Sequence, residues 1–276
     1  MAFAFPGMVE SRLVADGVFA KAYDAVTPAE RAVIKTGIAR MAAFFGPVEG
    51  VETHSVTTLR EGFCLHADSR RAPWAVVMWD GAYAGAMRVL AALVPAMLAG
   101  VTDILACRVG GGGAFPQPLL AAMELAGQEL VADCSPEDAA EIAALCGAAD
   151  TGGRLVLLGR NAAFDRIAAA ALERGTDVRR YAAPVRIGIA ASTFVTPSLD
   201  DTLRFVHPDA ALVPFEGDAA QGNFSAVYCA ENAVPQYLGR TPLVLCPGNE
   251  GFWRWPGVDR NFYRAQSLGI RDIEQV

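Results

Sequence analysis

The sequence predicts an α/β protein made of two α/β/α units with mainly parallel sheets. From residue 74 onward, short apolar segments alternate with helical patterns of 10–15 residues. This alternation is typical of parallel strands that are covered by helices on both faces. The chain has 276 residues, of which 53% are hydrophobic and 19% are charged. At roughly 150 residues per domain, it is long enough for one large domain or two moderate ones.

The first 72 residues are expected to form helices and a β-hairpin. Residues 8–25 have a loose helical period. The segment Thr27-Pro28-Ala29-Glu30 has the pattern of a capping box with proline in the first turn, which predicts a helix to about Phe45.

Residues 51–59 and 63–68 have the pattern of two strands joined by a tight turn. If the turn centres near Glu61, His54 faces position 68 and lies diagonal to His66. His54, His66 and Cys64 would then share one face of the hairpin. The alternatives are a small soft-metal site, a Cys–His dyad, or two half-exposed histidines beside a buried cysteine.

The remaining elements follow from apolar periodicity and from capping residues. Strands that precede a helix are expected at 74–79, 103–108, 129–132 and 154–158. Their helices are expected at 83–99, 118–126, 136–146 and 161–174, and one further helix is capped by 198–201. More strands are expected at 178–181, 186–190, 210–215 and 243–246. These elements suggest a first α/β unit at 73–150, a second at 151–246 and a tail at 247–276.

Composition excludes several classes of protein. The net charge is −7 and no basic stripe is visible, which argues against a nucleic-acid binder. The only lysines are Lys21 and Lys35, so the body of the chain has no lysine for a P-loop or for a pyridoxal Schiff base. The most apolar stretch, 81–101, contains Arg88 and Pro95, unlike a membrane span. With scattered cysteines and no evident signal peptide, a cytoplasmic protein with reduced thiols is expected.

Four segments, in order along the chain, resemble histidinol dehydrogenases. Residues 94–107, Val-Pro-Ala-Met-Leu-Ala-Gly followed by an apolar strand, resemble the family's Pro-Ala-Lys-x-Ala-Gly segment. Residues 119–127 are similar to its alanine-rich helix that ends in Ala-Gly. Residues 157–171 look like its Gly-Pro-Gly-Asn turn and helix, with Asn161 at the asparagine, and 186–192 match a later strand.

The resemblance implies an aldehyde-dehydrogenase-like fold of two Rossmann-like units, an NAD site and a homodimer completed by exchanged tails. The chain departs from the family at Met97, which replaces a lysine, and at 158–161, which keep only part of the turn. The family's zinc-ligand segment and its proton-transferring Glu-His pair have no counterpart in the sequence. NAD is therefore the expected cofactor, and zinc is not expected.

Two glycine-containing loops are the predicted cofactor-binding sites, because each follows a strand and precedes a helix. Glycines at such positions let backbone N–H groups approach an anion. The first loop is Gly110, Gly111, Gly112 and Gly113; the second is Gly159, Arg160 and Asn161. The competing interpretations are a flexible connector for the first loop, and helix capping with a surface salt bridge for the second.

Cys107 and Glu216 are the predicted catalytic residues, because both lie near predicted strand ends, where α/β proteins bind ligands. Cys107 would act as a thiolate nucleophile and Glu216 as an acid or base. Cys246 is a second thiol at a strand end, and His207 before a strand is the one histidine outside the hairpin. A capping or surface role is the competing interpretation for His207.

The tail mixes aromatic and arginine side chains, a composition typical of interface anchors. The aromatic residues are Phe252, Trp253, Trp255, Phe262 and Tyr263. The tail predicts a homodimer contact, with packing on its own core and ligand stacking as the alternatives. Three functions stay open: a zinc-independent NAD-dependent oxidoreductase that binds a nucleotide or small anion, a non-catalytic relative, and a dimeric interaction module.

Overall fold

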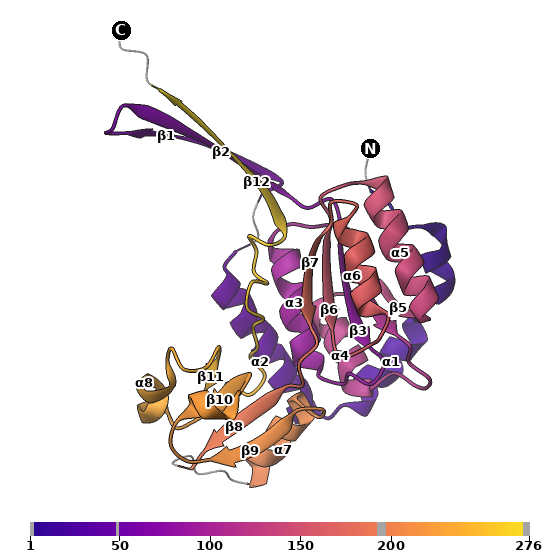
Figure 1. The fold of residues 1–276 in the computed structure, drawn as a ribbon. Helices are drawn as coiled ribbons and strands as arrows, with labels where there is room; N and C mark the ends of the chain where they lie inside the picture. Colours follow the sequence, from indigo (N-terminus) through magenta and orange to yellow (C-terminus); the bar gives the residue numbers. More distant parts are fainter. Residues whose placement is uncertain (1–2, 48–49, 192–196, 273–276) are drawn as a thin grey trace.

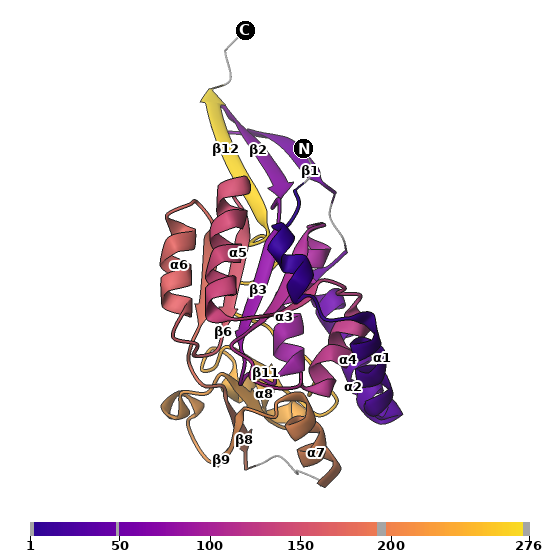
Figure 2. The same cartoon turned by 90° about the vertical axis from the view of Figure 1, so that its right-hand side faces the viewer.

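Figures 1 and 2 show the computed structural model of the chain, which describes residues 3–47, 50–191 and 197–272. Its strands form a five-stranded sheet, a four-stranded sheet and a three-stranded sheet. All pairs in the first two sheets are parallel, and those in the third are antiparallel. The predicted fold class, α/β with two mainly parallel sheets, is confirmed.

The five-stranded sheet has the order β5-β4-β3-β6-β7. Its strands are β3 (Ala75–Asp80), β4 (Ile104–Val109), β5 (Val131–Cys134), β6 (Arg154–Leu158) and β7 (Asp177–Tyr181). Within β3, Val77 and Trp79 face one core cluster while Val76 and Met78 face the other. Both faces are therefore buried, which explains the nearly continuous apolar runs of these strands.

Helices cover both faces of this sheet (Figure 2). The face of Val77 and Trp79 packs against α3 (Ala86–Leu98) and α4 (Gln117–Ala126), with α1 (Asp16–Ala25) and α2 (Pro28–Phe45) packed on these helices. The opposite face packs against three further elements: α5 (Pro136–Ala149), α6 (Phe164–Leu172) and the 3₁₀ helix Gly7–Arg12.

The predicted capping box at Thr27 is confirmed. The Thr27 hydroxyl accepts the Glu30 N–H, and the Glu30 carboxylate accepts the Thr27 N–H. Ser135 and Asp138 form a second capping box at the start of α5. Each box satisfies N–H groups that a helix leaves free in its first turn.

The four-stranded sheet has the order β11-β10-β8-β9. Its strands are β8 (Arg186–Ala190), β9 (Ala211–Phe215), β10 (Ala226–Tyr228) and β11 (Val244–Leu245), and two helices accompany them, α7 (Pro197–Val206) and α8 (Val234–Tyr237). The linker 182–185 joins the two parallel sheets. The division predicted at residue 150 falls inside the first sheet, because β6 and β7 pair with β3 and with each other.

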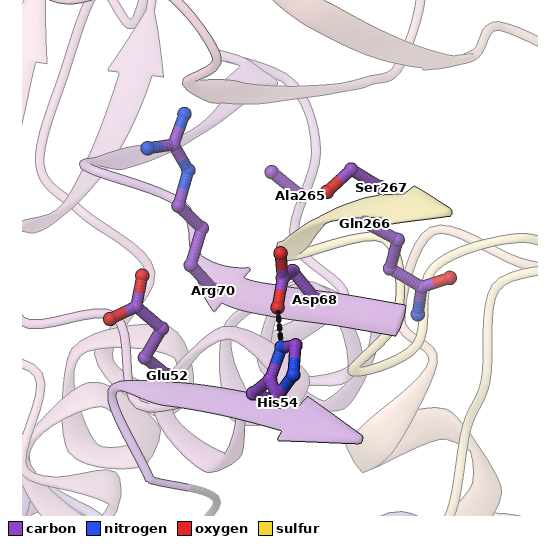
Figure 3. Close-up of a pocket in the computed structure, with 7 residues that line it drawn as sticks. All are labelled: Glu52, His54, Asp68, Arg70, Ala265, Gln266 and Ser267. Carbon is purple, nitrogen blue, oxygen red and sulfur yellow. Dashed lines mark hydrogen bonds and ion pairs between the residues drawn. The ribbon is translucent and has the colours of Figure 1, made fainter. Parts of the chain in front are cut away.

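The third sheet projects from the rest of the molecule (Figure 1) and consists of β1 (Glu52–Leu59), β2 (Phe63–Arg71) and β12 (Arg264–Asp272). The predicted hairpin register is confirmed: His54 faces Asp68, and the two side chains are hydrogen-bonded (Figure 3). The His54 and His66 ring centroids lie 6.0 Å apart. No group of three metal-ligating side chains occurs in the described part of the chain.

Part of the tail before β12 packs against α3. Trp255 Nε1 donates to the Arg88 carbonyl at 2.8 Å, and the Tyr263 hydroxyl donates to the Ala92 carbonyl at 2.6 Å. Trp253 and Phe262 are buried in the same core. Packing on its own core, an alternative for the tail aromatics, therefore holds for these four. Among the described residues, no helix has both the length and the apolarity needed to span a bilayer.

Candidate functional site

The candidate site lies between β3 and β6, where the order of the strands in the first sheet reverses. From β3, the chain builds outward through β4 and β5 on one side, and through β6 and β7 on the other. The loops after β3 and β6 therefore separate at the carboxyl edge of the sheet. Open α/β sheets bind their ligands in the crevice at this kind of switch point.

A cavity of about 210 Å³ occupies this point. Its walls come from the loops after β3 and β6, from the linker between the sheets and from the turn before β9. The lining residues are Asp80, Ala82, Tyr83, Gly159, Arg160, Ala182, Ala183, Pro184, Val185 and Asp209. The carboxyl edge of the first sheet and the amino edge of the second thus form the cavity together.

Close backbone packing fixes the loops around the cavity. A Cβ atom on Gly159 would lie 2.6 Å from Asp80 Cβ, and the backbone there has a φ of +100°. A Cβ atom on Gly81 would lie 2.6 Å from the Gly111 backbone. Glycine is therefore required at both positions by packing, and at Gly159 by its φ as well.

Of the second predicted loop, Gly159 and Arg160 line the cavity, and Arg160 is exposed. Arg160 Nε donates to the Ala182 carbonyl of the linker at 3.2 Å. Asn161 has a local role: its Oδ1 accepts the Ala163 N–H at 3.0 Å, and its Nδ2 donates to the Val109 carbonyl at 3.3 Å. Asn161 thereby brings the ends of β6 and β4 together.

The four-glycine loop is held by a buried arginine. Arg108 donates to the carbonyls of Gly113 and Ala114, and its Nε donates to Asp133 at 3.0 Å. The Arg108 guanidinium also stacks 3.8 Å from the Phe115 ring centroid. Gly110 and Gly111 pack close to the strand ends, whereas Gly112 and Gly113 have open space around them. Cofactor binding by these four glycines stays a prediction.

A buried polar cluster lies behind the cavity wall. Arg88, in the first turn of α3, is fully buried and forms an ion pair with Asp209. Its guanidinium carbon is 4.7 Å from the Tyr83 ring centroid and 6.0 Å from that of Trp253. Within the described residues, several buried polar atoms of this cluster have no hydrogen-bond partner: Tyr83 Oη, Arg88 Nε, Arg88 Nη1, His207 Nδ1 and Trp253 Nε1.

His207 belongs to this cluster and is fully buried, rather than on the surface. Its ring lies 5.1 Å from that of Trp253, and its Nε2 lies 3.1 Å from the Glu250 carbonyl. A carbonyl only accepts, so Nε2 carries the proton and Nδ1 presents a lone pair. Burial, assisted by the positive charge of Arg88, lowers the pKa of His207 to about 3. Burial also raises the pKa of Tyr83 well above its usual range.

Cys107 lies within β4 and is fully buried in the core beneath α5 and α6. The hydrogen bond with the Cys134 thiol and the burial of both raise the pKa of Cys107 well above its ordinary value. Since thiolates are the reactive form, this environment is that of a structural thiol. All six cysteines are free, and burial raises the pKa of Cys246 as well.

Glu216 follows β9 at the carboxyl edge of the second sheet and is exposed. The cavity lies at the opposite, amino edge, where Asp209 precedes β9. At about 3.3 Å per residue, the length of the strand separates the two by roughly 16 Å. The structure thus does not bring Glu216, Cys107 and the cavity together.

Tyr83, Asp209 and Trp253 were not predicted to meet, because they come from three distant segments. The one feature of the sequence that points to this cluster is Arg88, a charged residue inside an otherwise apolar helical stretch. A buried arginine needs a partner, but nothing in the sequence identifies that partner as Asp209.

Comparison with known proteins shows which solved structures share this fold. No protein-family profile and no curated protein matches the chain. Among solved structures, the chain is similar to histidinol dehydrogenase from Elizabethkingia anophelis, with a TM-score of 0.63 at 12% identity over 95% of this chain and 77% of that one. At this identity, the similarity concerns the fold alone.

Two aldehyde dehydrogenases are also similar, more distantly. Betaine aldehyde dehydrogenase from Staphylococcus aureus has a TM-score of 0.49 at 7% identity over 94% of this chain and 83% of that one. Succinate-semialdehyde dehydrogenase from Burkholderia pseudomallei has a TM-score of 0.49 at 9% identity over 88% and 77%. The TM-score of 0.63 shows that the chain shares its α/β fold with the histidinol dehydrogenase structure.

Proposed function

We propose that this chain is a dehydrogenase-like oxidoreductase that binds a small anionic organic molecule in the switch-point cavity. One observation carries the proposal: the cavity lies at the carboxyl edge of the first sheet, between the two units, with Arg160 on its wall. An exposed guanidinium at that position attracts carboxylates and phosphates.

NAD is the cofactor that the sequence resemblance suggests, and the cavity fits only part of it. Sites for drug-sized ligands measure about 300–1,000 Å³, and this cavity measures about 210 Å³. A whole dinucleotide would have to continue into the adjoining cavity of about 290 Å³, which shares Ala182, Ala183 and Val185 with the first. The negative charges of Asp80 and Asp209, which line the cavity, would also repel a pyrophosphate at the switch point.

A non-catalytic relative with a retained ligand site is the second candidate. The burial of Cys107 and the distance of Glu216 from the cavity favour it, because both predicted catalytic groups then lie outside the ligand site. Turnover of aldehydes or amino alcohols with NAD would decide for the enzyme, whereas ligand binding without turnover would support the non-catalytic relative.

Calorimetric titration tests the binding site. NAD and a small set of organic anions are titrated into the wild-type chain and into Arg160→Gln, with Arg166→Gln, an exposed arginine on α6, as the matched control. We expect binding of at least one anion, weakened about tenfold in Arg160→Gln and unchanged in the control. Equal affinity in all three proteins, or no binding of any anion, would contradict the proposal.

We further propose that the chain forms a homodimer through the three-stranded sheet, which includes β12 of the tail. Leu268 and Ile270 of β12 are each 70% exposed and pair in register with Ala67 and Leu65 of β2. The four side chains share one face of the sheet, because directly paired residues of antiparallel strands point to the same side. An exposed apolar face on a projecting sheet is typical of an association surface.

A further inference from the structure

We infer that the ligand of the switch-point cavity carries a carboxylate group, which binds Arg88 and the Tyr83 hydroxyl behind the cavity wall. The inference rests on the proposed function, since it concerns the same cavity. It goes further by naming the recognised group and the residues that recognise it.

The buried cluster contains more unpartnered hydrogen-bond donors than acceptors. Arg88 Nε, Arg88 Nη1 and Trp253 Nε1 are donors, the Tyr83 hydroxyl can donate, and none has a partner among the described residues. The unpartnered acceptors of this cluster are His207 Nδ1 and the Tyr83 oxygen, which can also donate. Leaving a buried donor unpaired is unfavourable. A ligand group with several acceptor oxygens and no donor of its own complements such a cluster.

The cavity gives this cluster a route to a ligand. Tyr83 and Asp209 line the cavity and also contact Arg88, whereas Arg88 itself is fully buried. The Asp209 side chain is 25% exposed. A ligand carboxylate reaches the Arg88 donors that Asp209 leaves unused when the Tyr83 side chain, which separates them from the cavity, moves aside.

Charge favours a carboxylate over a phosphate. Arg160, Asp80 and Asp209 line the cavity, and Arg88 lies behind its wall. A second negative charge on the ligand would add repulsion from both aspartates, and no further cation lines the cavity. A singly charged group is therefore favoured.

Gly85 keeps Arg88 in place. A Cβ atom on Gly85 would lie 2.1 Å from Arg88 Nη2 and 2.3 Å from Nε. Gly85→Ala must therefore displace the guanidinium without removing its charge. Gly17→Ala, on α1, is the matched control, since nothing lies within 4 Å of a Cβ atom at Gly17 and its φ is not positive.

The test uses butyrate, its neutral analogue butyramide and inorganic phosphate as probes at constant ionic strength. In ¹⁵N-labelled protein, the Arg88 Nε–H resonance is assigned by its loss in Arg88→Met. We expect butyrate to shift this resonance and raise the melting temperature, and butyramide to do neither. We expect phosphate to act more weakly. We expect Gly85→Ala to weaken butyrate binding at least tenfold, and Gly17→Ala to leave it unchanged.

Two results overturn the inference and leave the proposed function standing. One is an anion whose binding is lost in Arg160→Gln but kept in Arg88→Met and Gly85→Ala. The other is a phosphate response larger than the butyrate response. If no anion binds the wild-type chain, the inference and the proposed function both fail. If Arg88→Met does not fold, butyrate binding by Gly85→Ala, compared with Gly17→Ala, still decides.

Discussion

The fully buried guanidinium of Arg88 pairs with the carboxylate of Asp209, which lies 121 residues further along the chain. Arg88 belongs to the helix that follows the first strand of one parallel sheet, and Asp209 precedes a strand of the other. The pair therefore connects the two units at the wall of the switch-point cavity.

Removing the two partners should have unequal effects on stability. Asp209→Ala leaves the buried Arg88 charge uncompensated and is expected to cost about 3 kcal/mol. Arg88→Met removes that charge and leaves Asp209, which water reaches, so a cost of about 1 kcal/mol or less is expected. Urea denaturation of both variants measures the difference. Equal losses would show that Arg88 is compensated by other groups.

The buried His207 should make stability depend on pH. The folded pKa is lowered to about 3, whereas an unfolded histidine titrates near its ordinary value of about 6.5. Between these values the unfolded chain binds up to one proton more. His207 therefore leaves the free energy of unfolding undiminished above about pH 6.5, and lowers it by about 1.4 kcal/mol for each pH unit below that. Denaturation from pH 4.5 to 7.5 measures the slope.

The control for this slope is His207→Gln, which retains an N–H for the Glu250 carbonyl but does not titrate. We expect the free energy of unfolding of this variant to depend less steeply on pH, by the contribution of about one proton. His66→Gln, on the projecting sheet, serves as the comparison for a histidine outside the core. An unchanged slope in His207→Gln would mean that His207 is not the group responsible.

Cys107 should resist alkylation in the folded protein. It is fully buried and its pKa is raised, so native iodoacetamide treatment is expected to leave it unmodified while the partly exposed Cys246 reacts. Mass spectrometry of peptides after native and denatured labelling measures both. Faster labelling of Cys107 than of Cys246 would restore it as a candidate nucleophile.

The projecting sheet should control the oligomeric state. The double substitution Leu268→Asp with Ile270→Asp places two charges on its apolar face and is expected to convert a dimer into a monomer of 29.1 kDa. Leu172→Asp, at an exposed leucine of α6, is the matched control. Sedimentation equilibrium gives the masses. A monomeric wild-type chain, or a dimer that survives the double substitution, would refute the homodimer.

Local patterns were sufficient for much of the fold. The capping box at Thr27, the hairpin register that pairs His54 with Asp68, and the buried strands near 75–80 and 154–158 all follow from residues close together in the sequence. Helix caps, tight turns and strand periodicity are local interactions, and they act over a few residues. Strands β10 and β12 were missed, because a three-residue strand has too little pattern and β12 exists through its pairing with β2, about 200 residues away.

By itself, the sequence determined that the chain alternates buried strands with helices, and therefore that loops such as 159–161 lie at the carboxyl edge of a parallel sheet. Only the tertiary structure decided which side chains meet there. It joined Tyr83, Arg88 and His207 into one buried cluster, paired Arg88 with the more exposed Asp209, and separated Glu216 from them. The physical reason is that a buried charge must find its partner wherever packing brings one, and the sequence spacing of Arg88 and Asp209 carries no trace of that contact.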